Sequence, residues 1–188
     1  MRFIETILIT DKIKNLHYHN KRMNKTRYDF FNLPPIDLSE YIKIIPNKRV
    51  RVTYSKEIEK IEYFDLQKRE FKTFKIVKSD IDYSYKFADR DKLNSLKPKN
   101  VDEIIIVKNG YVTDTTISNL AFYDGKKWFT PKTPLLKGTK REELLNNGKI
   151  KVKNITPEEI KSYKKIALIN AILGFYIIDM QNITIISL

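Results

Sequence analysis

The chain has 188 residues, 41% of them hydrophobic, no cysteine, and a formal net charge of +13 at pH 7. This composition predicts a globular protein of one or two domains. It excludes disulfides, thiolate nucleophiles and cysteine-ligated metals, and two histidines are too few for a histidine-built metal site.

The first 78 residues predict a small α+β domain. Residues 2–10 read as a strand, and apolar positions at helical spacing predict a helix in NLHYHNKRMNKTRYDFF, which the prolines of LPP end. A second short helix is expected from Asp37 to Ile45. Three further segments predict strands: KRVRVTYS, IEYFDLQ and REFKTFKIVKSD.

Residues 79–86 are expected to form an irregular interdomain segment, and residues 87–188 a larger α/β domain. A helix is predicted over residues 89–96 and a buried strand over residues 103–108, with two hairpins after it. The segments LLKGTKREELLNNGKI and TPEEIKSY predict helices. KVKNIT predicts a strand, and KIALINAILGFYIIDM and ITIISL predict buried strands.

Two polar features interrupt these apolar patterns. The stretch VTDTTISNLAF places a carboxylate, hydroxyls and a carboxamide where a strand should end, at Asp114, Ser118 and Asn119. Taken alone, Asp114 could be a turn residue that binds the N–H groups after it. Asn170 lies among apolar residues, where an unpaired buried amide costs about 1–3 kcal/mol. It is either a hydrogen-bonded core asparagine or part of a binding site.

Charge and targeting signals indicate the cellular location of the protein and the class of its partners. The N-terminal sequence MRFIETILITD has charges within its first five residues and no long apolar core, unlike a signal peptide. No apolar run approaches the ~20 residues of a membrane span, so we expect a cytoplasmic protein without a membrane partner. The lysines are spread along the chain without an arginine-rich block. The charge therefore favours anionic small molecules over nucleic acid.

Five segments in this order resemble the class IV aminotransferases. This pyridoxal 5′-phosphate-dependent family includes branched-chain and D-amino-acid aminotransferases and 4-amino-4-deoxychorismate lyase. The segments are FIET…LHYHNKRM, YSYKFADRDKLNSL, DEIIIVKNGYVTDTTISNLAF, WFTPKTPLLKGTKREELL and INAIL. The resemblance implies a two-domain α+β fold like that of D-amino-acid aminotransferase, a cofactor between the domains, and a homodimer. Relatives usually carry an extra strand and turn before the FIET position, so we expect an N-terminally shortened version.

The resemblance also implies roles for particular side chains. Lys86 corresponds to the Schiff-base lysine, which binds the cofactor covalently and later moves the substrate proton as a general base. Asp114 stands where the family usually has Glu and would pair with the pyridine nitrogen. Arg22 would bind the phosphate. The further cofactor-binding residues implied by the resemblance are Ser118, Asn119, Gly138, Thr139, Lys140 and Asn170.

The reaction is predicted from two short motifs. The pair Asp89–Arg90 resembles the Asn-Arg pair of aminodeoxychorismate lyases more than the Gly-Asn-Tyr of branched-chain aminotransferases, and INAIL resembles the lyase Asn-Ala-Leu. The leading prediction is a lyase of folate biosynthesis that converts aminodeoxychorismate to 4-aminobenzoate and pyruvate. The alternatives are an aminotransferase acting on a branched-chain or D-amino acid, a non-catalytic binding protein that retains the fold, and a basic nucleic-acid-binding module.

Overall fold

The structure is a computed structural model that describes residues 1–187. The chain forms two compact units. Unit 1 consists of residues 1–68 and 85–89, and unit 2 consists of residues 69–84 and the chain from residue 90 onward. The mixture of helices and sheets agrees with the α+β prediction. No helix in the described part of the chain is both long and apolar enough to cross a membrane.

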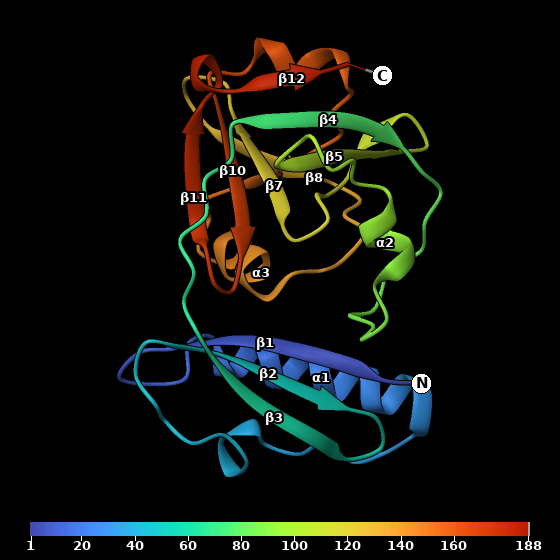
Figure 1. Cartoon of the computed structure of the whole chain (residues 1–188), viewed down its shortest axis with the longest axis vertical. Helices are drawn as coiled ribbons and strands as arrows, with labels where there is room; N and C mark the ends of the chain where they lie inside the picture. Colours follow the sequence, from blue (N-terminus) through green and yellow to red (C-terminus); the bar gives the residue numbers. More distant parts are fainter. Residues whose placement is uncertain (188) are drawn as a thin grey trace. The chain divides into compact units, whose positions relative to one another are not determined.

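Unit 1 is a three-stranded antiparallel sheet, in the order β1-β2-β3, with helix α1 against it (Figure 1). Alternating side chains of the sheet, such as Ile7 and Val50, form a core with Met23 of α1. The predicted strands and the first predicted helix are therefore confirmed. The elements are β1 (Phe3–Ile9), α1 (Leu16–Phe31), β2 (Lys48–Tyr54) and β3 (Ile58–Asp65).

The second helix predicted in unit 1 is only a single turn. The 3-10 turn η1 covers Leu38–Glu40, and the Asp37 carboxylate accepts a hydrogen bond from the backbone N–H of Ser39 at its start. After this turn Ile44 and Ile45 are exposed. A continued helix would have no buried apolar face there, so packing does not extend it.

Residues 85–89 return to unit 1 and lie along the free edge of β1. The backbone N–H of Ile4 donates to the Lys86 carbonyl at 2.9 Å, and the Ala88 N–H donates to the Arg2 carbonyl at 2.9 Å. Phe87 forms an isolated antiparallel bridge with Phe3. These contacts fix the backbone of Lys86 beside β1.

Unit 2 contains a five-stranded sheet in the order β11-β10-β7-β8-β9 and a four-stranded sheet in the order β12-β4-β5-β6 (Figure 1). Its strands are β4 (Thr73–Lys78), β5 (Glu103–Lys108), β6 (Tyr111–Val112), β7 (Asn119–Tyr123), β8 (Trp128–Pro131), β9 (Lys151–Lys153), β10 (Lys165–Asn170), β11 (Gly174–Asp179) and β12 (Thr184–Ile186). Its helices are α2 (Asp91–Ser95), α3 (Thr139–Asn146), η2 (Glu158–Ser162) and η3 (Met180–Asn182).

The boundary between the units differs from the expected one at residue 78. β4 pairs in parallel with both β5 and β12, which places it in unit 2. Parallel partners are distant in sequence, so local patterning does not show this pairing. The segment predicted as a helix at TPEEIKSY is the 3-10 helix η2, and residue 188, at the end of the last predicted strand, lies outside the described residues.

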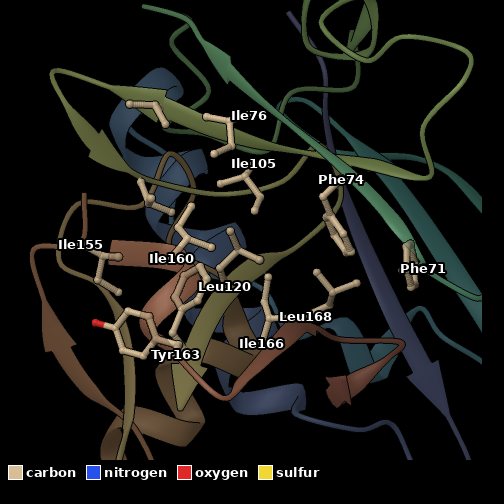
Figure 2. Packing of buried hydrophobic residues seen from close by; sticks show 13 residues of the cluster. Phe71, Phe74, Ile76, Ile105, Leu120, Ile155, Ile160, Tyr163, Ile166 and Leu168 are labelled. Atoms are coloured by element: carbon tan, nitrogen blue, oxygen red, sulfur yellow. The ribbon is translucent and has the colours of Figure 1, made fainter. Parts of the chain in front are cut away.

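The main core of unit 2 is formed by both sheets (Figure 2). Phe74 and Ile105 of the four-stranded sheet belong to one buried cluster with Leu120 and Leu168 of the five-stranded sheet. On the opposite face of β10, Ala167 belongs to a second cluster, which includes side chains of α3. Because β10 is buried on both faces, its sequence is almost continuously apolar. This packing fixes α3 against the five-stranded sheet.

Candidate functional site

The polar stretch before β7 is a loop closed by its own hydrogen bonds. Asp114 and Asn119 form an antiparallel bridge across its ends. The Thr115 hydroxyl accepts the N–H groups of Ile117 and Ser118 at 3.1 and 2.9 Å, and the Thr115 N–H donates to the Ser118 carbonyl at 2.9 Å. The hydroxyl and N–H of Thr115 therefore order the loop, which has Asp114 and Asn119 at its two ends.

Glu103 at the start of β5 binds the middle of this loop. One of its carboxylate oxygens accepts the Thr116 N–H at 3.1 Å, and both oxygens lie 2.8 Å from the Thr116 hydroxyl. The side chain is buried, and burial raises the pKa of the Glu103 carboxyl. The sequence analysis assigned no role to Glu103. Its signal was an acidic residue opening an otherwise buried strand, EIIIV.

The Asp114 carboxylate is buried, and its hydrogen-bond donors are neutral. Its Oδ1 accepts from Asn119 Nδ2 at 2.8 Å, and its Oδ2 accepts the Leu136 N–H at 2.9 Å. Burial raises the pKa of Asp114 to about 6, although these hydrogen bonds and the charge of Arg141 oppose the shift. A positive group placed against this carboxylate would be stabilised by a charge that the protein compensates only partly.

Helix α3 begins beside Asn119. Asn119 Nδ2 also donates to the Leu136 carbonyl at 2.7 Å, and a Cβ at Gly138 would collide with Asn119 Oδ1. Glycine is therefore required at position 138 because the Asn119 side chain lies too close for a Cβ, and not because of an unusual backbone conformation. It caps the helix without a side-chain hydrogen bond. The N–H groups of a first helical turn point out of the start of the helix, and this end of the helix dipole favours an anion.

Two basic side chains of α3 have partners within unit 2. Arg141 is buried, and its Nε and Nη2 donate to the Thr130 hydroxyl at 3.1 Å and the Pro131 carbonyl at 2.8 Å. Burial lowers the pKa of Arg141. It therefore ties α3 to β8, a role that the sequence analysis did not assign. Lys140 Nζ pairs with Glu143 Oε1 at 2.7 Å, one turn further along the helix.

Asn170 has partners for both ends of its amide. Its Oδ1 accepts the N–H groups of Ile172 and Leu173 at 2.9 and 2.7 Å, which closes the turn between β10 and β11. Its Nδ2 donates to the Ile117 carbonyl at 3.1 Å. These are the contacts of a hydrogen-bonded asparagine that braces the Asp114–Asn119 loop.

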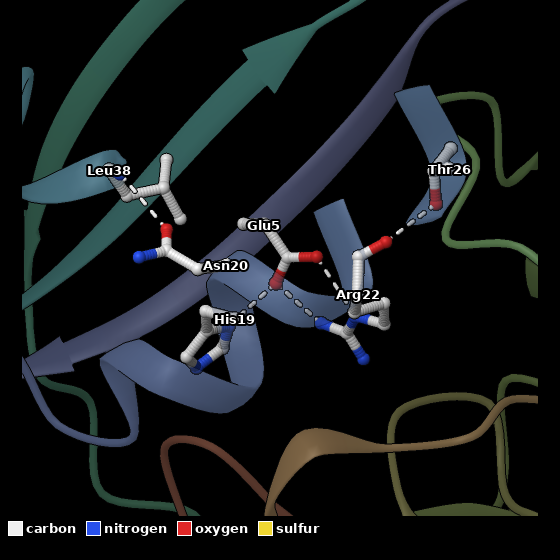
Figure 3. A network of polar contacts seen from close by, with 6 residues as sticks. All are labelled: Glu5, His19, Asn20, Arg22, Thr26 and Leu38. Atoms are coloured by element: carbon white, nitrogen blue, oxygen red, sulfur yellow. Dashed lines mark hydrogen bonds and ion pairs between the residues drawn. The ribbon is translucent and has the colours of Figure 1, made fainter. Parts of the chain in front are cut away.

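Unit 1 contains a second buried polar cluster, centred on Glu5 (Figure 3). Its carboxylate accepts from Arg22 Nε at 2.9 Å, from Arg22 Nη2 at 2.5 Å and from His19 Nδ1 at 2.6 Å. Burial alone would raise the pKa of Glu5, but Arg22 and His19 outweigh it and lower the value to about 2. Burial also lowers the pKa of His19, so the neutral ring carries its proton on Nδ1 and donates it to Glu5.

Arg22 and Lys86 both belong to this region of unit 1. The charges of both residues lower the pKa of His19, which places Lys86 in the electrostatic neighbourhood of the Glu5 cluster. The Lys86 side chain is half-buried. The Arg22 side chain is 15% exposed, and its Nε and Nη2 both pair with the Glu5 carboxylate.

The predicted site residues therefore form two groups. Arg22 and Lys86 belong to unit 1, near Glu5. The group in unit 2 is joined by the Asp114–Asn119 loop, to which the start of α3 and the side chain of Asn170 are attached. Its members are Asp114, Ser118, Asn119, Gly138, Thr139, Lys140 and Asn170. Both groups hold buried, ordered charge, the kind of arrangement in which shifted pKa values accompany function.

Comparison with known proteins places the chain in a family. The family model described as amino-transferase class IV matches residues 84–179, slightly more than half of the chain. This chain belongs to the class IV aminotransferase family. A Haemophilus influenzae protein of uncharacterised activity is 38% identical to this family member over 182 residues, which cover 90% of this chain and 97% of that protein.

Solved structures show the class IV fold. A crystal structure from Haemophilus somnus 129pt, provisionally described as a 4-amino-4-deoxychorismate lyase, is similar with a TM-score of 0.86 and 38% identity. The match covers 92% of this chain and 97% of that one. The pyridoxal-phosphate-bound form of a hypothetical aminotransferase from Mycobacterium tuberculosis has a TM-score of 0.75 and 15% identity, over 94% of this chain and 80% of that one. The predicted fold class is confirmed.

Proposed function

We propose that this class IV chain is a pyridoxal-phosphate-dependent 4-amino-4-deoxychorismate lyase. Two observations support the lyase over other members of the family. The Haemophilus somnus protein, provisionally described as this lyase, matches nearly the whole chain at 38% identity. The chain also carries the lyase-like Asp89–Arg90 pair after Lys86. The cofactor assignment depends chiefly on Asp114.

The donor chemistry around Asp114 fits the cofactor. A buried carboxylate with neutral donors at both oxygens suits a positively charged ring nitrogen, and the pairing would lower the raised pKa of Asp114. Asp is shorter than the Glu that is common in the family. Hydrogen bonds from Asn119 and the Leu136 N–H fix the position of the Asp114 carboxylate. When bound, pyridoxal phosphate supplies an electron sink for the electrons left by a departing proton.

The phosphate is assigned to two cationic or positively polarised groups. Arg22 would bind it through a charge-assisted pair, with Glu5 holding the guanidinium in place. The first-turn N–H groups of α3, at Thr139 and Lys140, would bind it through aligned backbone dipoles. Gly138, the N-cap residue of α3, has no side chain that could block access of an anion to these N–H groups.

Lys86 is assigned to the chemistry itself. Its Nζ would bind the cofactor carbonyl covalently and be released when the substrate amine takes its place. The same Nζ would then take the proton from the amine-bearing carbon of aminodeoxychorismate. The C–O bond on the neighbouring carbon would then break with its electron pair on oxygen, so that enolpyruvate leaves and tautomerises to pyruvate while the ring becomes aromatic as 4-aminobenzoate.

A cofactor-binding measurement tests this proposal first. Purified protein titrated with pyridoxal phosphate should develop an absorbance band that borohydride abolishes, and peptide mass mapping should find the reduced adduct on Lys86. Protein that takes up no cofactor would contradict the enzyme proposal and favour a non-catalytic binding protein that retains the fold.

An amino-acid aminotransferase is the second candidate, because the matching family model carries that description. The cofactor-binding residues do not separate the two reactions, so the substrate must. The lyase proposal predicts that aminodeoxychorismate yields equal amounts of 4-aminobenzoate and pyruvate without a 2-oxo acid acceptor. Turnover only of branched-chain or D-amino acids with a 2-oxo acid would favour the aminotransferase.

We also propose that the protein is a homodimer. Unit 1 exposes large apolar side chains, including Tyr28, Tyr41 and Ile44, of which Tyr28 is 65% exposed. Such side chains are commonly covered in oligomers. Analytical ultracentrifugation at micromolar concentration should give the mass of two chains, and a monomer at that concentration would contradict the proposal.

A further inference from the structure

Arg90 makes a direct contact with the loop that presents Asp114. Its Nη2 donates a 2.6 Å hydrogen bond to the Thr116 carbonyl, and its guanidinium lies 5.7 Å from the centre of the Tyr83 ring. All three residues belong to unit 2. In the sequence, Arg90 indicates only the resemblance to the lyases. The contact with Thr116 assigns it a structural role.

The loop is held from several sides, and Arg90 is one of the points of attachment. Within the loop, the Ser118 carbonyl is bound by the Thr115 N–H. Two further carbonyls of the loop are bound by side chains from distant segments, Thr116 by Arg90 and Ile117 by Asn170. Glu103 binds the N–H of the same peptide residue, Thr116. Thr116 is therefore held between a cation on its carbonyl and a carboxylate on its amide.

The contribution of Arg90 is geometric rather than electrostatic at Asp114. The charge of Arg141 lowers the pKa of that carboxylate. Arg90 instead fixes the backbone two residues after Asp114. A hydrogen bond from a guanidinium to a carbonyl is worth more than one between neutral groups, and its loss removes this restraint on the Thr116 carbonyl.

We propose that Arg90 is a positioning residue: by binding the Thr116 carbonyl it fixes the loop that presents the Asp114 carboxylate to the cofactor ring. The part of this inference that concerns the loop stands on the contacts of unit 2. The part that concerns the ring rests on the proposed function. The two parts are therefore tested by separate measurements.

The first measurement is amide hydrogen exchange in protein without pyridoxal phosphate. Arg90→Met should raise the exchange rates of the Thr116, Ile117 and Ser118 amides about tenfold. Arg90→Lys, which keeps a donor of similar reach, should restore most of the protection. Arg69→Met removes an exposed arginine of the same unit and should leave the loop unchanged.

The second measurement is the affinity for pyridoxal phosphate in a double-mutant cycle. Arg90→Met should weaken binding about tenfold when Asp114 is present, and the loss should largely disappear in an Asp114→Asn background, because both changes act through one carboxylate. Arg90→Lys should again lie near the wild type.

Three results would overturn the inference. Loop amides that exchange at the wild-type rate in Arg90→Met would show that the bond does not order the loop. Faster exchange spread evenly over unit 2 would show general destabilisation instead. An undiminished affinity loss in the Asp114→Asn background would show that Arg90 acts by another route. If the wild type binds no pyridoxal phosphate, the proposed function fails, and the exchange rates still decide whether Arg90 orders the loop. Should Arg90→Met not fold, Arg90→Gln, whose amide is shorter, takes its place.

Discussion

The two units each bury a carboxylate completely, and the two carboxylates have opposite pKa shifts. Glu5 in unit 1 has its pKa lowered to about 2, while Asp114 in unit 2 has its pKa raised to about 6. Burial by itself raises the pKa of both carboxyls. The difference arises from the partners: Glu5 is bound by the guanidinium of Arg22 and by His19, whereas the donors to Asp114 are an amide side chain and a backbone N–H.

Under the proposed function, this difference separates a structural carboxylate, Glu5, from a cofactor-binding one, Asp114. The Glu5 charge is compensated within unit 1, and its geometry fixes Arg22. The Asp114 charge is only partly compensated, so a positively charged ligand group would complete its environment. Both carboxylates are buried. The identity of the neighbouring donors therefore distinguishes them.

The largest effect is expected from Lys86→Ala, which removes the reactive amine while leaving both carboxylates in place. Turnover should fall by about a thousandfold or more, because the proposed function makes the residue both the covalent attachment point and the base. Peptide mapping after borohydride should find no lysine adduct. Lys92→Ala, on α2, should retain wild-type turnover, and an adduct persisting in Lys86→Ala would assign the attachment to another lysine.

Glu5→Gln tests whether the unit 1 carboxylate is structural. The change removes the charge of a fully buried carboxylate that pairs with Arg22, so the free energy of unfolding should fall by about 3 kcal/mol in urea titrations. Glu57→Gln, at an exposed glutamate, should change it by less than about 0.5 kcal/mol. Equal, small losses in both variants would remove the distinction drawn between the two carboxylates.

Asp114→Asn tests whether the unit 2 carboxylate is reserved for a ligand. The variant keeps the shape but loses the charge, so turnover should fall about a hundredfold through lost stabilisation of the ring nitrogen. Cofactor affinity should fall much less, since Arg22 and the start of α3 remain. Parallel measurements of kcat and of the dissociation constant separate these losses. Equal losses would indicate that Asp114 is a structural turn residue.

The pH dependence of stability should differ in sign between the two sites. The native pKa of Asp114 is raised from 3.8 to about 6, so its contribution is present at low pH and is lost as the pH rises across that interval. The native pKa of Glu5 is lowered from 4.5 to about 2, so its contribution is lost as the pH falls across that interval.

Urea unfolding of the cofactor-free protein between pH 3 and 7 measures this difference. The stability of the wild type minus that of Asp114→Asn should fall by about 2 kcal/mol between pH 4 and 6.5. A difference that is flat with pH would show that Asp114 does not carry a raised pKa.

The smallest effect is expected from Asn170→Ala, which removes a brace of the Asp114 loop. Loss of its hydrogen bonds should lower the free energy of unfolding by about 1 kcal/mol. Asn100→Ala, at an exposed turn, provides the matched control. A loss of cofactor affinity far beyond the loss of stability would instead give Asn170 direct contact with the ligand.

Local patterning predicted much of the fold. The predicted strand at residues 103–108 matches β5, and the eight-residue helix led by Gly138 matches α3. β5 is indicated by a continuous apolar run, and α3 by a glycine directly before its first residue. The placement of β4 could not be predicted in this way, because its partners β5 and β12 are distant in sequence.

The site was predicted less completely, for a related reason. Family resemblance indicated Asp114 and Asn119, and the structure shows their side chains bound to each other. The supporting residues Glu5, Glu103 and Arg90 act through partners that are distant in sequence. Glu5 and Glu103 could still have been noticed in the sequence. Each is a charged residue in or beside an apolar strand, FIETILI or IIIV, and a buried charge needs a partner.

The return of residues 85–89 to β1 has a consequence for synthesis and for protein fragments. When only the first 68 residues have been synthesised, the edge of β1 is uncovered, because the segment that binds the backbone of Ile4 comes later in the chain. An uncovered strand edge invites pairing with other chains. A fragment ending at Lys68 should therefore aggregate more readily than one extended through Asp89, and the peptide carrying Lys86 also serves as the closing strand of the first unit.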